Sequence, residues 1–188
     1  MEAMRNERFR DIVGRPEFGR VLDYAEGKGR LGAAMKAAWP EKLVAGWDPG
    51  WQVDHGEMTN PSDAIGSECW PGWADLIICL DMLEHVEPGV GGNGLRYVEN
   101  VLEDIRRCLR PGGPRKVLFG VATTPAIAML PAFGSLPERN AHLTVEPWGW
   151  WWEEMSRAGF SLVGSEGDFL VPGRGSFLAL LTGAPDGS

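Results

Sequence analysis

The segment from Val21 to Gly29 joins a short strand, an acidic side chain and a glycine-rich loop. Few folds use this combination. Val21 to Tyr24 is short and mostly apolar, as expected of a strand in a covered sheet. Gly27 and Gly29 follow, and a helical pattern begins directly after them. Glycine removes the side chains that would keep a ligand away from the backbone. We therefore expect an α/β domain with a ligand bound at this turn.

Strand and helix patterns alternate along the rest of the chain, which favours an α/β sheet of mostly parallel strands. The spacing predicts helices over 3–13, 31–38, 95–109 and 147–158, and strands over 21–24, 43–47, 74–80, 116–121, 160–170 and 176–182, with a short further strand near 64–65. A turn at 171–175 leaves no room for a helix between the last two strands. We expect those strands to form an antiparallel hairpin.

The length and composition fit one globular domain over residues 1–188, with the first helix lying within 1–19. The chain has 188 residues, of which 44% are apolar and 23% charged. No apolar run approaches the ~18 residues of a membrane span, and the N-terminus lacks the apolar core of a secretion signal. The three cysteines have neither metal-knuckle spacing nor an even count. We therefore expect a cytoplasmic protein that does not enter a membrane.

The charge balance bears on the partners of the protein. The net charge is −8, whereas broad binding to nucleic acid needs a basic surface. A small-molecule substrate is therefore expected in preference to a nucleic acid. For the assembly we expect a monomer or a homodimer.

The glycine loop has two interpretations. Gly27 to Gly32 matches the G-x-G-x-x-G pattern of dinucleotide-binding enzymes, and Asp48 lies where a ribose-binding acid belongs. An oxidoreductase that uses NAD(P) or a flavin is therefore an alternative. In that pattern, however, the strand positions two and four residues before the first glycine are buried and apolar. Here they are Ala25 and Asp23, and a charge in such a position is costly.

Read from Asp23, the loop is Asp-x-Ala-x-Gly-x-Gly. This resembles the first motif of the class I S-adenosylmethionine-dependent methyltransferases, which is normally acidic-x-Gly-x-Gly-x-Gly. Trp47-Asp48-Pro49 resembles their second motif, 74–86 (ADLIICLDMLEHV) their fourth, and 109–113 (LRPGG) the turn before their fifth strand. The likeness extends from Val21 to about Phe160, and 139–143 followed by Pro147 also resembles small phage and bacterial methyltransferases.

The resemblance implies a fold, a cofactor and a set of binding residues. The fold would be a Rossmann-like, mostly parallel sheet of seven strands in the order 3-2-1-4-5-7-6, with helices on both faces and a C-terminal antiparallel hairpin. The cofactor would be S-adenosylmethionine. The implied cofactor-binding residues are Asp23, Ala25, Gly27, Gly29, Asp48, Pro49 and Asp81.

Two acidic residues have clear physical roles in this interpretation. Asp23 would counter the sulfonium and amino groups of the methionine moiety. The two carboxylate oxygens of Asp48 would accept hydrogen bonds from both ribose hydroxyls. Ala25 replaces the first glycine of the motif, and alanine fits there if its φ is negative.

Asp81, Glu84 and His85 follow the most apolar strand, at the edge of the sheet where ligands bind. Their spacing resembles the acidic-x-x-Glu-His motif of two metal-dependent groups, the ubiquinone-pathway and the small-RNA 3′-end O-methyltransferases. Those groups add a later histidine, here His142. These four residues would suit Mg²⁺, Mn²⁺, Zn²⁺ or Fe²⁺. Two alternatives remain: a metal-free catalytic role for His85 or Glu84, and a purely structural one.

The connection over residues 122–145 is long and contains three prolines, which is uncommon unless the segment is functional. We expect it to act as a lid. The leading hypothesis is an O-methyltransferase, assisted by a divalent metal, for a small-molecule or nucleotide hydroxyl. The alternatives are an NAD(P)-dependent oxidoreductase and a cofactor-binding module without turnover.

Overall fold

The computed structural model describes residues 3–48, 71–86, 89, 97–130, 139–162 and 176–183. The chain divides into two compact units. The first comprises Met1–Cys79 and Ile105–Val117, and the second comprises Leu80–Asp104 and Leu118–Ser188. The single domain expected over 1–188 stays a prediction.

The first unit begins with two short helices where one was predicted. A 3-10 turn, η1 (Ala3–Arg5), precedes α1 (Glu7–Val13). Asn6 separates them because its side chain accepts a hydrogen bond from the backbone N–H of Phe9 at 3.1 Å and so caps α1. Helix α1 buries its apolar face, including Phe9 and Ile12.

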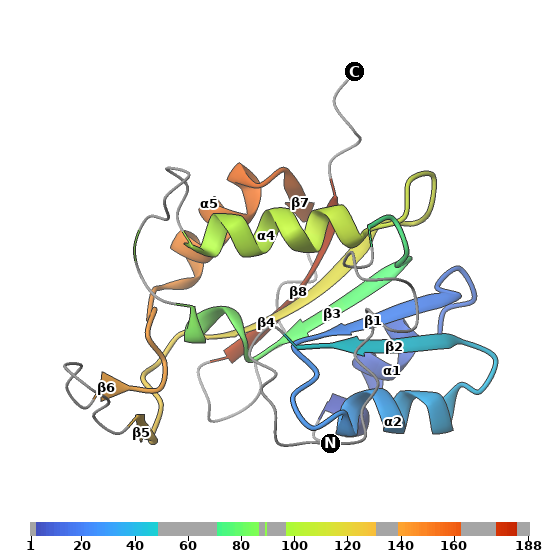
Figure 1. Ribbon diagram of the computed structural model, residues 1–188, viewed down its shortest axis with the longest axis horizontal. Helices are drawn as coiled ribbons and strands as arrows, with labels where there is room; N and C mark the ends of the chain where they lie inside the picture. The colour runs from blue at the N-terminus through green and yellow to red at the C-terminus, as the bar shows by residue number, and fades with distance from the viewer. Residues whose placement is uncertain are drawn as a thin grey trace. The chain divides into compact units, whose positions relative to one another are not determined.

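Three parallel strands form the core of the first unit. They are β1 (Arg20–Tyr24), β2 (Leu43–Trp47) and β3 (Leu76–Leu80). Strand β1 pairs with both of the others, so it lies between them, as Figure 1 shows. Helix α2 (Arg30–Ala38) packs against β2. These strands and α2 agree closely with the predicted elements.

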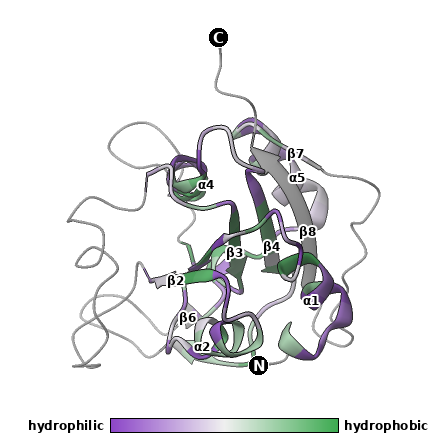
Figure 2. Ribbon diagram, turned by 90° about the vertical axis from the view of Figure 1, so that its right-hand side faces the viewer, coloured by the Kyte–Doolittle hydropathy of each residue, from purple (hydrophilic) through white to green (hydrophobic). Residues whose placement is uncertain are grey.

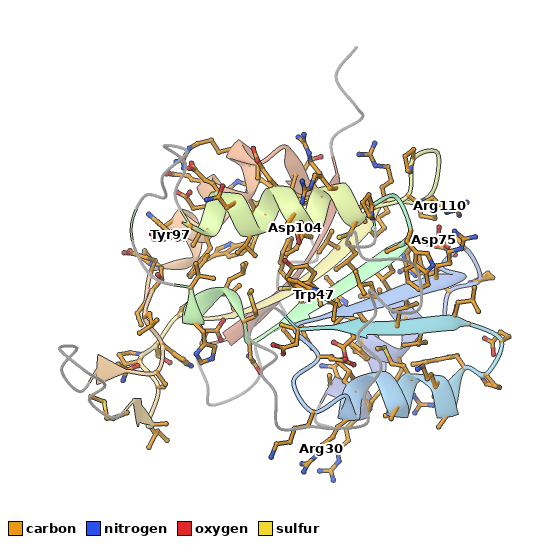
Figure 3. All side chains as sticks on the ribbon, in the orientation of Figure 1. Arg30, Trp47, Asp75, Tyr97, Asp104 and Arg110 are labelled. Carbon is orange, nitrogen blue, oxygen red and sulfur yellow. The ribbon has the colours of Figure 1, made fainter. Side chains whose placement is uncertain are left out.

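A buried ion pair fixes the amino end of β3. Asp75 is 2% exposed and accepts hydrogen bonds from the backbone N–H of Arg20 at 3.0 Å and from Nε of Arg110 at 2.7 Å. The guanidinium of Arg110 also forms a salt bridge with Asp75, and Figure 3 shows the two side chains together. A buried carboxylate needs such partners, so this pair joins β1, β3 and the turn after α4.

Two elements continue from the first unit into the second. Helix α4 (Tyr97–Cys108) and strand β4 (Lys116–Ala122) each have residues in both. Strand β4 is buried from Val117 onward. Figure 2 shows β3 and β4 as predominantly hydrophobic, which explains why both read as apolar runs in the sequence.

The second unit holds the remaining elements. They are the 3-10 turn η2 (Leu83–His85), β5 (Met129–Leu130), β6 (Arg139–Asn140), α5 (Trp148–Arg157), β7 (Phe160–Leu162) and β8 (Ser176–Gly183). Strands β7 and β8 are antiparallel, which confirms that part of the prediction. The expected lid, 122–145, contains the small antiparallel pair β5 and β6.

The hydrogen-bonded order of the main sheet is β2-β1-β3-β4-β8-β7. The expected order of seven strands becomes this order when its third strand is removed. That strand was predicted near Ala64–Ile65, which lies outside the described residues. The described sheet therefore has six strands where seven were expected, and its order and C-terminal hairpin match the prediction.

Within the described residues, none of the helices has both the length and the apolar character needed to cross a membrane.

Candidate functional site

Two groups of predicted site residues occur, one in each unit. The first is the loop between β1 and α2. Gly27 has φ of 53° and Gly29 has φ of 65°, which is the left-handed region that glycine adopts without strain. Gly29 is also the N-cap of α2. The two glycines therefore make the sharp turn from strand to helix that the sequence predicted.

Ala25 adopts a conformation that we did not expect. Its φ is 70°, whereas the sequence argument required a negative φ. The backbone N–H groups of Ala25 and Glu26 both donate to the carbonyl oxygen of Trp47, at 2.6 and 3.0 Å. This anchor to β2 fixes the turn, and the side chain of alanine must then accept the strain. A left-handed residue other than glycine costs ~1–2 kcal/mol.

Asp48 lies at the end of β2, as predicted, and reaches back to the glycine loop. Its Oδ2 accepts the backbone N–H of Gly27 at 2.8 Å. The contact joins the two strand ends where the resemblance places the cofactor. Pro49, the other residue predicted there, lies outside the described residues.

Asp23 is buried in β1 with 3% of its surface exposed. Its Oδ2 has no hydrogen-bond partner among the described residues. Burial raises the pKa of Asp23 to about 7, and the negative charges of Glu26 and Asp48 act in the same direction. A buried carboxylate oxygen that lacks a partner is a site for a donor or a cation supplied by a ligand.

The second group brings together three of the four predicted metal ligands. Glu84, His85 and His142 each offer a ligand atom within 4.8 Å of the others. Asp81 is not a member of this group. It is exposed and has φ of 51°, and its charge adds to the rise in the pKa of Glu84. Three of the four predicted ligands therefore lie together, and the metal site itself stays a prediction.

Backbone hydrogen bonds explain how residues 58 positions apart meet. The carbonyl oxygen of Glu84 accepts the N–H groups of Leu143 at 2.7 Å and of Thr144 at 3.0 Å. The hydroxyl of Thr144 donates to the carbonyl oxygen of Val86 at 2.7 Å. The segment around His142 is therefore fastened along η2, which carries Glu84 and His85.

Each histidine uses Nδ1 for a backbone contact. Nδ1 of His85 lies 2.8 Å from the carbonyl oxygen of Ala141, and Nδ1 of His142 lies 2.7 Å from that of Thr124. A carbonyl oxygen only accepts, so Nδ1 must carry the proton in both rings. In the neutral rings Nε2 then keeps its lone pair. Metal-ligating histidines commonly have this arrangement.

Glu84 completes the group with a buried carboxyl. The residue is fully buried, and Oε1 accepts the backbone N–H of Ala122 at 3.3 Å. Oε2 has no hydrogen-bond partner among the described residues. Burial raises the pKa of Glu84 to about 7. An unpartnered buried oxygen beside two imidazoles is suited to a metal ion or to a proton held for catalysis.

Asn140 was missed by the sequence analysis, although it organises the loop that carries His142. Its Oδ1 accepts the N–H of Ala126 and the N–H of His142, both at 2.9 Å. Its Nδ2 donates to the carbonyl oxygen of Ala126 at 2.8 Å. Only the order Asn140-Ala141-His142 hinted at this, because asparagine often bonds the backbone two residues later.

No protein-family model matches the chain, and no curated protein matches its sequence. Solved structures do match. The 1,6-didemethyltoxoflavin-N1-methyltransferase of Burkholderia thailandensis, solved with S-adenosylhomocysteine, has a TM-score of 0.55 and 18% identity over 93% of this chain and 74% of its own. An O-methyltransferase family protein of the same organism has a TM-score of 0.56 and 18% identity over 98% of this chain and 58% of its own.

A third structural match is an enzyme whose name gives a different reaction. The [4+2]-cyclase SpnF has a TM-score of 0.55 and 13% identity over 96% of this chain and 82% of its own. The chain spans little more than half the length of the O-methyltransferase family protein. The chain therefore has the Rossmann-like fold of S-adenosylmethionine-dependent methyltransferases. That fold does not by itself determine the reaction.

Proposed function

We propose that this protein is an S-adenosylmethionine-dependent methyltransferase that methylates a hydroxyl group, assisted by a divalent metal. The observation that carries the proposal is the group of Glu84, His85 and His142. Oε2 of Glu84 has no hydrogen-bond partner among the described residues, and both histidines use Nδ1 for a backbone carbonyl. The glycine turn with Asp23 and Asp48 supports the choice of cofactor.

In this proposal the residues of the first unit hold the methyl donor. S-adenosylmethionine supplies a methyl group on a positively charged sulfur. Asp23 offers a buried negative charge to the methionine end, and Asp48 offers its carboxylate to the ribose. Gly27 and Gly29 leave the backbone of the turn open to the ligand. These residues bind and orient the donor, because displacement at the methyl carbon requires alignment above all.

The residues of the second unit act on the acceptor. A divalent ion held there would supply Lewis acidity, which would lower the pKa of a hydroxyl in a diol-like or catechol-like acceptor. Its ligands would be Glu84 and the Nε2 atoms of His85 and His142, because the Nδ1 atoms are already engaged. One carboxylate with two imidazoles suits Zn²⁺, Mn²⁺ or Fe²⁺ better than Mg²⁺, which prefers oxygen ligands.

Protein groups would also receive the hydroxyl proton. His85 is exposed and its Nε2 has a free lone pair in the neutral ring, so it is the first candidate base when no metal is bound. Glu84 has a pKa of about 7, which also suits proton transfer near neutral pH. In the metal-free alternative, His85 or Glu84 would therefore accept the hydroxyl proton directly.

The dinucleotide alternative has less support. Dinucleotide-binding sheets continue into a second parallel mononucleotide-binding half. Here the two strands that follow in the main sheet, β7 and β8, pair antiparallel. The charged Asp23 also occupies a buried strand position that is apolar in the dinucleotide pattern.

The proposal is tested by incubating the full chain with methyl-labelled S-adenosylmethionine, a catechol and each divalent ion in turn. We expect label to appear in the catechol, and H142A to lower turnover at least tenfold. An equal rate for the unmodified chain with and without a chelator, unaffected by H142A, would exclude the metal but not the methyl transfer. Absence of donor binding by the unmodified chain would reject the function.

A further inference from the structure

Glu26 is a carboxyl group in the glycine loop to which the proposed function gives no role. Its side chain folds back over the end of β2. A Cβ at Gly46 would overlap the carboxyl of Glu26, so the absence of a side chain at Gly46 creates the space that it occupies. Glu26 is consequently half-buried, although most glutamates in loops extend into water.

Glu26 and Asp23 converge on one place. A Cβ at Gly32, near the start of α2, would lie 3.7 Å from Oδ2 of Asp23 and 3.9 Å from Oε2 of Glu26. Asp23 is 97% buried, and this same Oδ2 lacks a hydrogen-bond partner among the described residues. An unpartnered, buried carboxylate oxygen beside a second carboxyl indicates a place for a positively charged ligand.

The surrounding charges support this interpretation. Burial is the main cause of the raised pKa of Asp23. Glu26 and Asp48 raise it further, whereas the Gly32 N–H lowers it. Burial also raises the pKa of Glu26, with Asp48 acting in the same direction and Lys36 in the opposite one. Near neutral pH the pair therefore retains part of a proton, and a bound cation would favour the fully ionised form.

We propose that Glu26 and Asp23 form a cation-binding pair that makes the loop prefer the sulfonium methyl donor to the thioether product. This inference rests on the proposed function. In methyl transfer the carbon–sulfur bond breaks, its electron pair stays on sulfur, and the methyl carbon bonds to the acceptor oxygen. The donor thus has a positive sulfur and the product a neutral one. A second carboxylate stabilises the donor more than the product, which would reduce inhibition by the product.

The test compares binding of S-adenosylmethionine and S-adenosylhomocysteine by calorimetry. Glu26→Gln removes the charge, and Glu41→Gln, an exposed residue of the same unit, is the matched control. We expect Glu26→Gln to reduce the preference for the donor by about threefold to tenfold, as for loss of one charge at intermediate polarity. Glu41→Gln should leave the preference unchanged. An unchanged preference in folded Glu26→Gln would overturn the inference.

A second variant applies if Glu26→Gln fails to fold. Gly46→Ala keeps the charge but displaces the flexible Glu26 side chain. It should also lower the preference, and no change in folded Gly46→Ala would count against the pair. The unmodified chain should release about half a proton per donor bound at pH 7, whereas no proton release would contradict the pair. Binding of neither ligand by the unmodified chain would instead reject the proposed function.

Discussion

The imidazole rings of His85 and His142 meet edge to face, with their centroids 5.1 Å apart and their planes at 82°. Each ring fixes its Nδ1 on a backbone carbonyl. Two imidazoles held at this distance beside a buried carboxyl make a more specific arrangement than the sequence motif alone, because the motif could not say whether the later histidine reaches the earlier one.

The two clustered histidines should contribute to metal affinity, whereas Asp81 should not. H85A and H142A should each weaken binding of Zn²⁺ or Mn²⁺ by about tenfold or more, since each removes a ligand atom. Asp81→Asn should change the affinity by less than about threefold, because Asp81 lies outside the cluster. Equilibrium dialysis with metal analysis measures this. A loss in Asp81→Asn as large as in the histidine variants would restore the four-ligand hypothesis.

Asn140 should position His142 without binding the ligand itself. Asn140→Ala removes the bonds to Ala126 and to the N–H of His142, so metal affinity should fall by about tenfold. Asn140→Asp keeps the acceptor oxygen and should retain most of the affinity. Dialysis at pH 8, with circular dichroism to confirm folding, gives the comparison. Equal losses of metal affinity in both variants would indicate that the hydrogen bonds accepted by Oδ1 do not maintain the metal site.

Ala25→Gly should stabilise the protein, because Ala25 has φ of 70°. Relief of the left-handed strain is worth ~1–2 kcal/mol, and the greater freedom of glycine in the unfolded chain offsets ~0.4–1 kcal/mol. The free energy of unfolding should rise by about 0.5–1 kcal/mol in urea titrations. Ala34→Gly in α2 is the control and should lower it by about 1 kcal/mol. Destabilisation by Ala25→Gly would show that the turn is not strained.

Stability should depend on pH through Asp23 and Glu84. Burial raises the pKa of Asp23 from 3.8 to about 7 and that of Glu84 from 4.5 to about 7. Between about pH 4 and pH 7 these two carboxyls are ionised in the unfolded chain but still hold protons in the folded protein. The free energy of unfolding therefore falls as pH rises from about 4 to 7, with the full loss present above about 7.

The expected loss is at most about 4 kcal/mol for Asp23 and about 3 kcal/mol for Glu84. Urea unfolding of the metal-free protein at pH 5.5 and pH 8 measures it. Asp23→Asn should remove only the part of the pH dependence due to Asp23, whereas Asp11→Asn, an exposed change on α1, should leave it unchanged. A protein that is more stable at pH 8 than at pH 5.5 would contradict the assigned shifts.

The sequence predicted most of the fold because its signals are local. Apolar runs such as 76–80 and 116–122 are buried strands, and the glycines at 27 and 29 make the turn that their spacing indicates. The turn predicted at 171–175 indicated an antiparallel hairpin, and β7 and β8 do pair antiparallel.

The site was less predictable because it depends on contacts between distant segments. The proximity of His142 to Glu84 was expected only from a family resemblance, and it depends on backbone bonds that no pattern encodes. The expectation of a negative φ at Ala25 was wrong, because the N–H groups of Ala25 and Glu26 both bond to the carbonyl oxygen of Trp47. The carboxyl of Glu26 was overlooked because its space comes from Gly46, in another strand.

The central claim is that the turn from β1 to α2 binds S-adenosylmethionine. Calorimetric titration of the full chain with S-adenosylmethionine and, separately, with NAD tests it most directly. We predict binding of S-adenosylmethionine with one site per chain, weakened at least tenfold in Asp23→Asn, and no binding of NAD. Binding of NAD without binding of S-adenosylmethionine would contradict it.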